Sequence, residues 1–307
     1  MPAVTSADSL RECSLLAAES GEPLAGTAEP VDCWVMLEFR GVWQARALEH
    51  NGLPSPVQDW LTAGVKGLCA KGFKTRPQLI RQQHNRDKGH LSLFVGFAGI
   101  TQPGLYEFRA ATHEEFTAID LLSLAENRPA YSANLVSGDR YFVCTNGQRD
   151  TCCSLHGMPV YAELARQCTS AAWQTTHLGG HRFAATLVSL PSGAVYGQLR
   201  SNDVSSLLKA HAAGTLLLPK LRGRSGLDPA SQVAEIALRQ RSGEHQLARY
   251  SLLAAESQDG VERRVFLDSL DQSRQEIRLV PDEERLLFRA GCAEDTLKSR
   301  VLYRVLP

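Results

Sequence analysis

The hydrophobic pattern of the early chain predicts strands and helices in a definite order. The run 31–39 is apolar enough to be a central strand. A helix is expected next, capped by Ser55 and ending at Gly72. A second helix should begin at Thr112, where Glu115 completes a capping box. Between the two helices, the pattern predicts three strands at 77–82, 90–98 and 105–111.

The same order of elements starts again after a polar linker at 126–139. The expected elements are a strand at 141–143, a helix at 160–166 with Pro159 in its first turn, a strand at 172–176, a hairpin of 185–190 with 194–199, and a helix from Asn202 or Asp203 to Ala212. Strand, helix, strand, hairpin and helix is the order of thioredoxin-like folds. We therefore predict an α/β (α+β) protein with two thioredoxin-like halves, each a mixed sheet flanked by helices.

Three domains are expected along the chain. Residues 1–135 should form an N-terminal thioredoxin-like domain without metal ligands, although residues 1–30 show little periodicity and are expected to be a loose lead-in. Residues 136–220 should form the second thioredoxin-like domain, with the candidate site. Residues 221–307 should add a C-terminal helix and a small antiparallel extension, which packs against the second half or docks a partner.

A basic, glycine-rich segment at 221–226 joins the second half to this extension. Its two arginines, Arg222 and Arg224, could contact an anion or a partner. Two arginines are few for that role, so a solvated connector is the favoured interpretation.

Charge and hydrophobicity limit the classes of function. The 307 residues include 33 basic and 33 acidic side chains, so the formal net charge is zero. Bulk attraction to nucleic acid or to a membrane surface is therefore not indicated. No apolar run has the length of a membrane-spanning helix, and the N-terminal segment lacks the pattern of a signal peptide. We expect a cytoplasmic protein without a nucleic-acid or membrane partner.

Two pairs of possible metal ligands distinguish the second half. Cys144 and Cys153 have eight residues between them, and His177 and His181 have three, two of which are glycines. Glycines disfavour a helix here, so the histidines are expected on a loop. Thiolates together with imidazoles suit iron, iron–sulfur clusters, zinc or copper. These four residues are therefore the candidate metal site.

Other cysteines and histidines have less support as ligands. Cys152 is adjacent to Cys153, and the two cannot easily face one metal, so Cys152 is expected to be an inert or supporting neighbour. The remaining cysteines are scattered, and we interpret them as small buried hydrophobic residues. They are Cys13, Cys33, Cys69, Cys168 and Cys292.

A [2Fe-2S] cluster is one occupant that matches the ligand count. Two cysteines on one iron and two histidines on the other would complete it, as in Rieske-type centres. Two neutral imidazoles in place of two thiolates make the cluster less negative, so its potential should lie above that of an all-cysteine ferredoxin. Imidazoles can also exchange protons, so electron uptake should depend on pH.

The motifs resemble a known family. Residues 141–214 are similar to the thioredoxin-like [2Fe-2S] ferredoxins, with the opening CTNGQRDTCC and the hairpin LPSGAVYGQL. The loop HLGGH places histidines where those ferredoxins have cysteines, which resembles the sucrase/ferredoxin-like family. The resemblance implies that Cys144, Cys153, His177 and His181 bind a [2Fe-2S] cluster. It also implies electron transfer with donor and acceptor proteins that the sequence does not identify.

Three functions remain in competition. An electron carrier or oxidoreductase component is favoured over a hydrolase, because no pair of carboxylates stands out for sugar hydrolysis. A Cys₂His₂ zinc site of structural or catalytic role ranks second. A thiol redox protein ranks last, because no C-x-x-C motif begins a helix.

Overall fold

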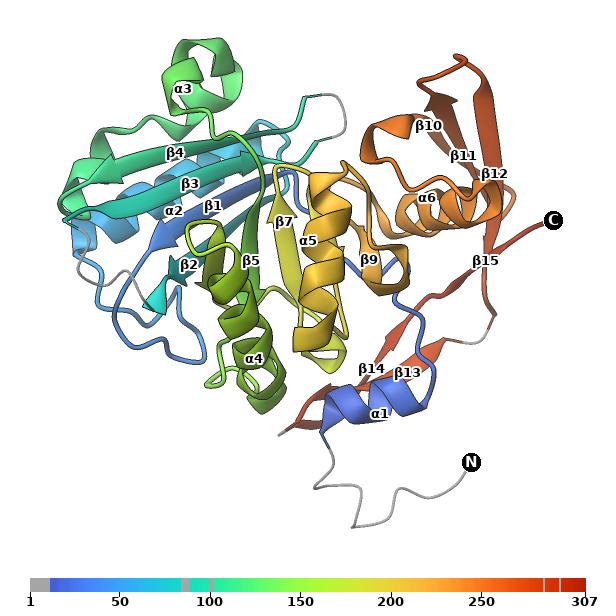
Figure 1. Ribbon diagram of the computed structural model, residues 1–307, viewed down its shortest axis with the longest axis horizontal. Helices are drawn as coiled ribbons and strands as arrows, with labels where there is room; N and C mark the ends of the chain where they lie inside the picture. Colours follow the sequence, from blue (N-terminus) through green and yellow to red (C-terminus); the bar gives the residue numbers. More distant parts are fainter. Residues whose placement is uncertain (1–11, 84–88, 100–101, 284, 293) are drawn as a thin grey trace.

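A nine-stranded mixed sheet forms the centre of the protein (Figure 1). The computed structural model describes residues 12–83, 89–99, 102–283, 285–292 and 294–307. Its strand order is β4-β3-β1-β2-β6-β5-β7-β8-β9. The order places the strands of the early chain on one side and those of the middle chain on the other, so the sheet has two halves. This confirms the predicted α/β class.

The first half is built on a parallel pair of strands joined by a helix. Its elements are β1 (Cys33–Glu38), α2 (Ser55–Ala70), β2 (Thr75–Arg81), β3 (Leu91–Phe97) and β4 (Gly104–Ala110). β1 pairs parallel with β2 and antiparallel with β3, and β3 pairs antiparallel with β4. The predicted strands of this half are confirmed, each with a shift of one or two residues at its ends.

The second half repeats this arrangement. Its elements are β5 (Arg140–Cys144), α4 (Thr151–Gln167), β6 (Ala172–Thr175), β7 (Leu187–Leu190), β8 (Ala194–Tyr196) and α5 (Val204–Ala212). β5 pairs parallel with β6 and antiparallel with β7, which pairs antiparallel with β8. The halves join where β2 pairs antiparallel with β6, with Ile80 opposite Thr175.

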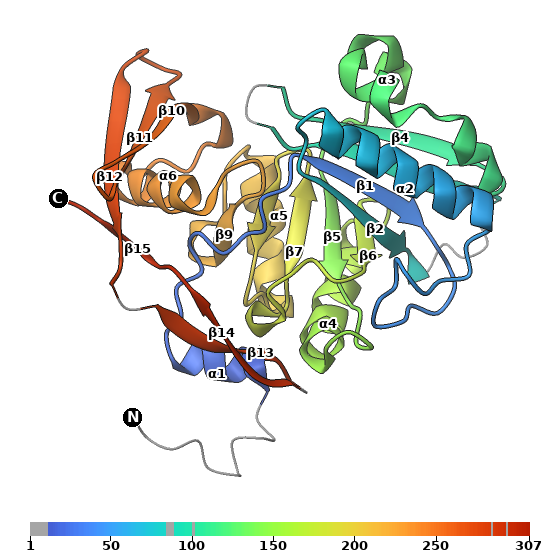
Figure 2. The same cartoon turned by 180° about the vertical axis from the view of Figure 1, so that it is seen from behind.

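The sheet curls around a buried core, and the helices lie on its outer face. Trp34 and Met36 of β1 point into the same core as Phe142 and Cys144 of β5. The alternate residues of these strands pack outward, against α2 in the first half and against α4 and α5 in the second. The curl therefore brings α2 and α4 to opposite sides of the molecule, as the two views show (Figures 1 and 2).

The segment after β4 does not form the predicted second helix. It is divided into a 3₁₀ turn, η3 (Glu114–Ala118), and a short helix, α3 (Leu121–Glu126). Glu115 does accept a hydrogen bond from the Thr112 N–H, as in a capping box. The side chain of Asp120 caps α3 separately, because it accepts from the N–H groups of Leu122 and Ser123. The prediction missed this second start signal.

Helix α4 begins nine residues earlier than predicted, and this correction changes the site. The Asp150 side chain accepts a hydrogen bond from the Cys152 N–H and caps the helix there. Pro159 lies inside the helix rather than in its first turn. Proline has no N–H group, so the helix lacks one hydrogen bond to the carbonyl four residues back, which is that of Leu155. Leu155 is half exposed. Cys152 and Cys153 therefore lie on a helix and not on a loop.

The remaining short 3₁₀ turns connect these elements. They are η4 (Arg128–Asn134), η5 (His181–Phe183), η6 (Ser201–Asp203), η7 (Leu218–Lys220) and η8 (Leu247–Arg249).

The two ends of the chain meet beside the second half. The predicted loose lead-in contains helix α1 (Cys13–Glu19), whereas residues 1–11 lie outside the described residues. Strands β13 (Leu286–Gly291) and β14 (Glu294–Arg300) form a hairpin next to α1 (Figure 2). Their position shows that the C-terminal extension packs against the N-terminal helix as well as the second half.

The rest of the extension confirms the predicted helix and strands. Helix α6 (Pro229–Ser242) starts at the Asp228 cap and packs on a four-stranded antiparallel sheet. That sheet consists of β10 (Tyr250–Gln258), β11 (Val261–Asp268), β12 (Arg274–Pro281) and β15 (Tyr303–Val305). Among the described residues, none of the helices has the length and apolar character required to cross a membrane.

The prediction of a solvated connector at 221–226 is wrong. Its first residues form β9 (Leu221–Arg224), the edge strand of the nine-stranded sheet, and both arginines are buried. The Arg224 Nε donates to Glu235 of α6 over 2.9 Å, and Arg239 donates to the same carboxylate over 2.8 Å. The Arg224 pair joins α6 to the large sheet, and the Arg239 pair lies within α6, so Glu235 takes part in two buried ion pairs.

Removing the charge of Glu235 should destabilise the protein. Burial alone would raise the pKa of Glu235, but Arg224 and Arg239 lower it below its ordinary value. The ion pairs therefore stabilise the fold above the carboxyl's unfolded-state pKa, and this contribution is lost as pH falls through the lower folded-state pKa. At neutral pH, Glu235→Gln should lower the free energy of unfolding by about 3–5 kcal/mol, measured by urea denaturation. Glu163→Gln, in the exposed pair with Arg166, is the control and should change little; an equal effect of both substitutions would contradict the assignment.

Candidate metal centre

Cys144 and Cys153 lie side by side inside the curled sheet. Cys144 ends β5, Cys153 is in the first turn of α4, and each is 1% exposed. A hydrogen bond from Cys153, together with His177, lowers the pKa of Cys144 well below its ordinary value despite burial. That hydrogen bond and burial raise the pKa of Cys153. The Cys153 thiol thus favours a thiolate at Cys144, and a thiophilic cation would compete with the thiol proton for these sulfurs.

His177 approaches both sulfurs from the loop after β6. Its Nδ1 lies 3.6 Å from the Cys153 Sγ and 4.0 Å from the Cys144 Sγ. Gly179 and Gly180 adopt positive φ angles of 91° and 70°, which turn the loop back toward the sheet. Cys144, Cys153 and His177 thus form one of the groups whose ligand atoms are close enough to hold a metal ion.

Two arginines and a glutamine, from both halves of the sheet, hold this loop. Arg76 and Gln78 of β2 donate to the His177 carbonyl over 2.9 and 3.2 Å. Arg222 of β9 donates to the Gly179 carbonyl over 3.1 Å. Burial and the nearby charges of Arg182 and Arg300 lower the pKa of Arg222 to about 9. The loop therefore lies in a positively charged environment that favours thiolates and anionic groups.

His181 lies next to this group but faces a different set of side chains. Its ring centroid is 5.5 Å from that of His177. Its Nδ1 is 3.2 Å from the Cys13 Sγ and 3.3 Å from the Asp150 Oδ2. Metal-bound histidines commonly present one ring nitrogen to a carboxylate and the other to the metal. The structure thus brings three of the four expected ligands into one group and places His181 at its border.

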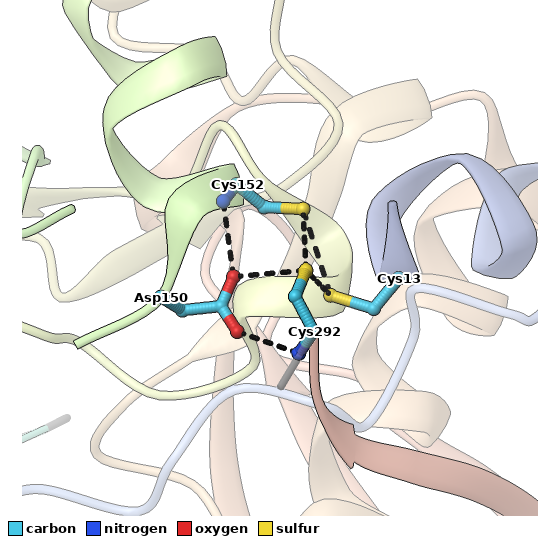
Figure 3. A group of neighbouring side chains, drawn as sticks. All are labelled: Cys13, Asp150, Cys152 and Cys292. Atoms are coloured by element: carbon cyan, nitrogen blue, oxygen red, sulfur yellow. Dashed lines mark hydrogen bonds between the residues drawn. The ribbon is translucent and has the colours of Figure 1, made fainter. Parts of the chain in front are cut away.

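A second group of sulfurs, which the sequence did not suggest, lies next to His181 and is drawn in Figure 3. The Sγ atoms of Cys13, Cys152 and Cys292 point toward one another, with separations of 3.2, 3.2 and 3.6 Å. With Asp150 they form another group that could hold a metal. The interpretation of Cys13 and Cys292 as isolated buried residues was therefore wrong. Their separation along the chain by more than a hundred residues leaves no spacing signal.

Of the three remaining scattered cysteines, only Cys33 agrees with the expectation of a buried residue, and the expectation is wrong for Cys69. Cys33 is buried in the core of the first half, whereas Cys69 is exposed on α2. Cys168 donates to the Leu164 carbonyl at the end of α4. Within the described parts of the chain, none of these three is near another possible ligand group.

The start of α4 separates the two adjacent cysteines. Successive residues of a helix point about 100° apart. Cys153 therefore faces Cys144 and His177, whereas Cys152 faces Cys13 and Cys292. The expectation that the two would not face one metal agrees with this geometry, but the expectation that Cys152 is inert does not.

Hydrogen bonds make Cys152 the most acidic thiol of the second group. Donation from Cys13, and further donation from Ser14, lower the pKa of Cys152 to about 6 against the effect of burial. The pKa of Cys13 is raised by the same contact and by burial. Burial also raises the pKa of Cys292 to about 11. One thiolate therefore forms at neutral pH without a metal, and a cation would be needed to ionise the others.

A surface cavity of about 560 Å³ leads to the first group. It is lined by His177 and Thr176 together with three arginines, Arg46, Arg76 and Arg149, among other residues. His177 is half-buried, so its imidazole is reached from this cavity, whereas the two sulfurs behind it are not.

The comparison with known families covers this site. Residues 24–223 match the sucrase/ferredoxin-like family. The chain belongs to the sucrase/ferredoxin-like family. No curated protein and no solved structure matches it. The family match includes both halves of the sheet, with Cys144, Cys153, His177 and His181, but neither Cys13 nor Cys292.

The donor atoms of this family member suit a metal centre. Soft sulfur and borderline nitrogen donors converge in a buried position. The half-buried guanidinium of Arg76 also lies there, and the charge of Cys144 acts on it. Paired thiolates would otherwise repel each other in a low-dielectric interior. The residues therefore fit a cationic metal or a cluster core, although they do not identify it.

Helix α4 approaches β5 closely at Gly157. A Cβ atom at this position would lie 2.1 Å from the Cys144 carbonyl oxygen, which is backbone and cannot rotate away. Gly157→Ala should therefore displace α4 from β5 and separate Cys153 from Cys144, with a loss of about 1–3 kcal/mol in unfolding free energy. Metal content per folded chain and urea denaturation would measure both effects.

Gly67→Ala in α2 is the matched control for this substitution. The Cβ there meets only the movable end of the Leu122 side chain. It should retain the wild-type metal content. Unchanged metal content in Gly157→Ala would show that the close contact does not position the site.

Proposed function

We propose that this protein transfers electrons through a [2Fe-2S] cluster bound by Cys144, Cys153, His177 and His181. The observation that supports this proposal most strongly is that the ligands form two chemically distinct pairs. The two buried sulfurs lie within 4.8 Å of each other, and the two imidazoles come from one loop with ring centroids 5.5 Å apart. Two sulfurs and two imidazoles are the ligand set of a cluster with one Cys₂ iron and one His₂ iron.

We infer further that both halves are thioredoxin-like. In support, each half has a parallel pair joined by a helix, then an antiparallel hairpin, in the orders β2-β1-β3-β4 and β6-β5-β7-β8. In this proposal the first half is a structural copy without ligands. Arg76 and Gln78 support this role, because from the first half they hold the carbonyl of His177.

The surrounding charges favour acceptance of an electron at this position. When bound, the cluster would supply a one-electron redox couple. The half-buried guanidinium of Arg76 and the buried guanidinium of Arg222 lie by the histidine loop. Positive charge in a low-dielectric interior stabilises the reduced, more negative state. These arginines would therefore raise the reduction potential, in addition to the effect of imidazole ligands.

The cavity at His177 is the proposed route for electrons. The imidazole lines this cavity and would be the ligand nearest to a partner protein. Arg46, Arg76 and Arg149 line the cavity with one acidic residue, Glu49, so the surface suits a redox partner with acidic groups. The electron donor and the electron acceptor are therefore proposed only as proteins with acidic groups at their contact surfaces.

A single zinc ion is the second candidate for this site. The distances of 3.6 and 4.0 Å from the His177 Nδ1 to the two sulfurs favour it, since these three atoms could bind one tetrahedral ion. Thiol redox catalysis has less support. Cys144 and Cys153 are each 1% exposed, so a disulfide substrate could not reach either sulfur.

Metal and sulfide analysis distinguishes these candidates. Protein purified anaerobically should contain iron and acid-labile sulfide in equal amounts, with visible absorption that bleaches on reduction. Zinc at this site without sulfide would reject the cluster and support the zinc candidate. Assays of Cys144→Ser, which should lose iron and sulfide, would assign the metal to this group.

Replacing an imidazole by a thiolate should lower the reduction potential. His177→Cys adds negative charge at the cluster and disfavours the reduced state. The effect should be a shift to lower potential with iron and sulfide retained, measured by redox titration with optical detection. His245→Cys, at an exposed histidine of the C-terminal extension, is the control. Equal potentials in both variants would show that His177 is not a ligand.

A further inference from the structure

We propose that Cys13, Cys152 and Cys292, with Asp150, bind a structural zinc ion separate from the family's site. Cys13 is on α1, Cys152 is on α4, and Cys292 is in the turn between β13 and β14 (Figure 3). An ion here would join three segments that are far apart in the sequence. Two of its three thiol ligands lie outside the part of the chain that matches the family.

The positions of the sulfurs fit one ion. Separations of 3.2, 3.2 and 3.6 Å allow all three Sγ atoms to lie about 2.3 Å from a point about 1.2 Å off their plane, and 2.3 Å is the usual zinc–sulfur distance. Tetrahedral zinc places its sulfurs about 3.8 Å apart, so these separations would widen by only about 0.2–0.6 Å when zinc binds.

Asp150 is placed to complete four ligands. Its Oδ1 lies 3.3 Å from the Cys292 Sγ, and its Oδ2 accepts from the Cys292 N–H over 2.9 Å. Its Oδ1 also accepts from the Cys152 N–H and fixes the start of α4. Three thiolates and one carboxylate oxygen form a closed tetrahedral set, which is typical of structural zinc. The oxygen ligand disfavours copper(I), which prefers sulfur alone.

The surroundings are suited to a permanent ion. Cys13, Cys152 and Asp150 are buried, and Cys292 is half-buried. The sulfur of Cys152 lies at the N-terminal end of α4, where the helix dipole stabilises negative charge. Ser14 donates to the same sulfur over 3.3 Å. Hydrogen bonds of this kind orient and stabilise thiolate ligands.

The neighbouring contacts show what the ion would hold. Arg182, next to His181, pairs with Glu22 after α1 over 2.8 Å and stacks 3.6 Å from the ring centre of Phe288 in β13. His156 of α4 contacts Glu12 at the start of α1 over 2.8 Å. The α1 helix and the hairpin thus cover His181, and the zinc ion would fix this cover at its centre.

The test is metal analysis of the full chain purified anaerobically from zinc-supplemented cells. Wild-type protein should contain one zinc per chain that Cys13→Ser and Cys292→Ser reduce at least tenfold, while iron and sulfide are retained. Cys69→Ser, at an exposed cysteine, is the matched control and should keep the zinc. Circular dichroism verifies that each variant is folded.

A second measurement follows the covering segments themselves. A zinc chelator should speed hydrogen exchange at residues 12–20 and 286–300 in wild type, and these segments should already exchange fast in Cys292→Ser. Exchange in α2 should not change and serves as the internal reference.

Three results would overturn the zinc site. They are a wild-type chain without this zinc, a disulfide between two of these cysteines in its place, and loss of iron and sulfide together with zinc in Cys13→Ser. Failure of the proposed electron carrier is a separate outcome: iron and sulfide would be absent while a zinc sensitive to Cys13→Ser remained.

Discussion

The cap that Asp150 places on α4 is the interaction on which both candidate centres depend. It starts the helix at Thr151, so Cys152 and Cys153 occupy the first turn and point in different directions. One sulfur enters the core inside the curled sheet, and the other meets the two ends of the chain. The same carboxylate contacts His181 and Cys292. A single side chain therefore sets the helix start and links the two groups of ligands.

The rest of the fold brings segments that are distant in the sequence to the two groups of ligands at the start of α4. The antiparallel joint between β2 and β6 places Arg76 and Gln78 of the first half on the histidine loop of the second. The edge strand β9 contributes Arg222, and Gly157 lets α4 lie directly on the end of β5. A first half without sulfur ligands can in this way support a site in the second by charge and hydrogen bonding.

Local sequence signals predicted much of this structure. The apolar run at 31–39 identified β1, and the predicted hairpin of 185–190 with 194–199 corresponds to β7 and β8. The paired spacings around Cys144 and His177 identified the first group of ligands. The start of α4 was missed because Pro159 resembled a helix start, while the effective signal was the cap at Asp150.

Contacts between residues far apart in the sequence could not be predicted from local signals. Nothing near Cys13 or Cys292 in sequence indicates that their sulfurs lie 3.2 Å apart. The burial of Arg222 likewise becomes evident only when β9 is placed at the edge of the sheet.

The central claim is that two adjacent cysteines serve two different metals. Anomalous diffraction at the iron and zinc absorption edges, from crystals of anaerobically purified protein, tests it most directly. The account predicts an iron signal beside the Cys153 sulfur and a separate zinc signal beside the Cys152 sulfur. One shared metal position, or no anomalous signal at either sulfur, would contradict it.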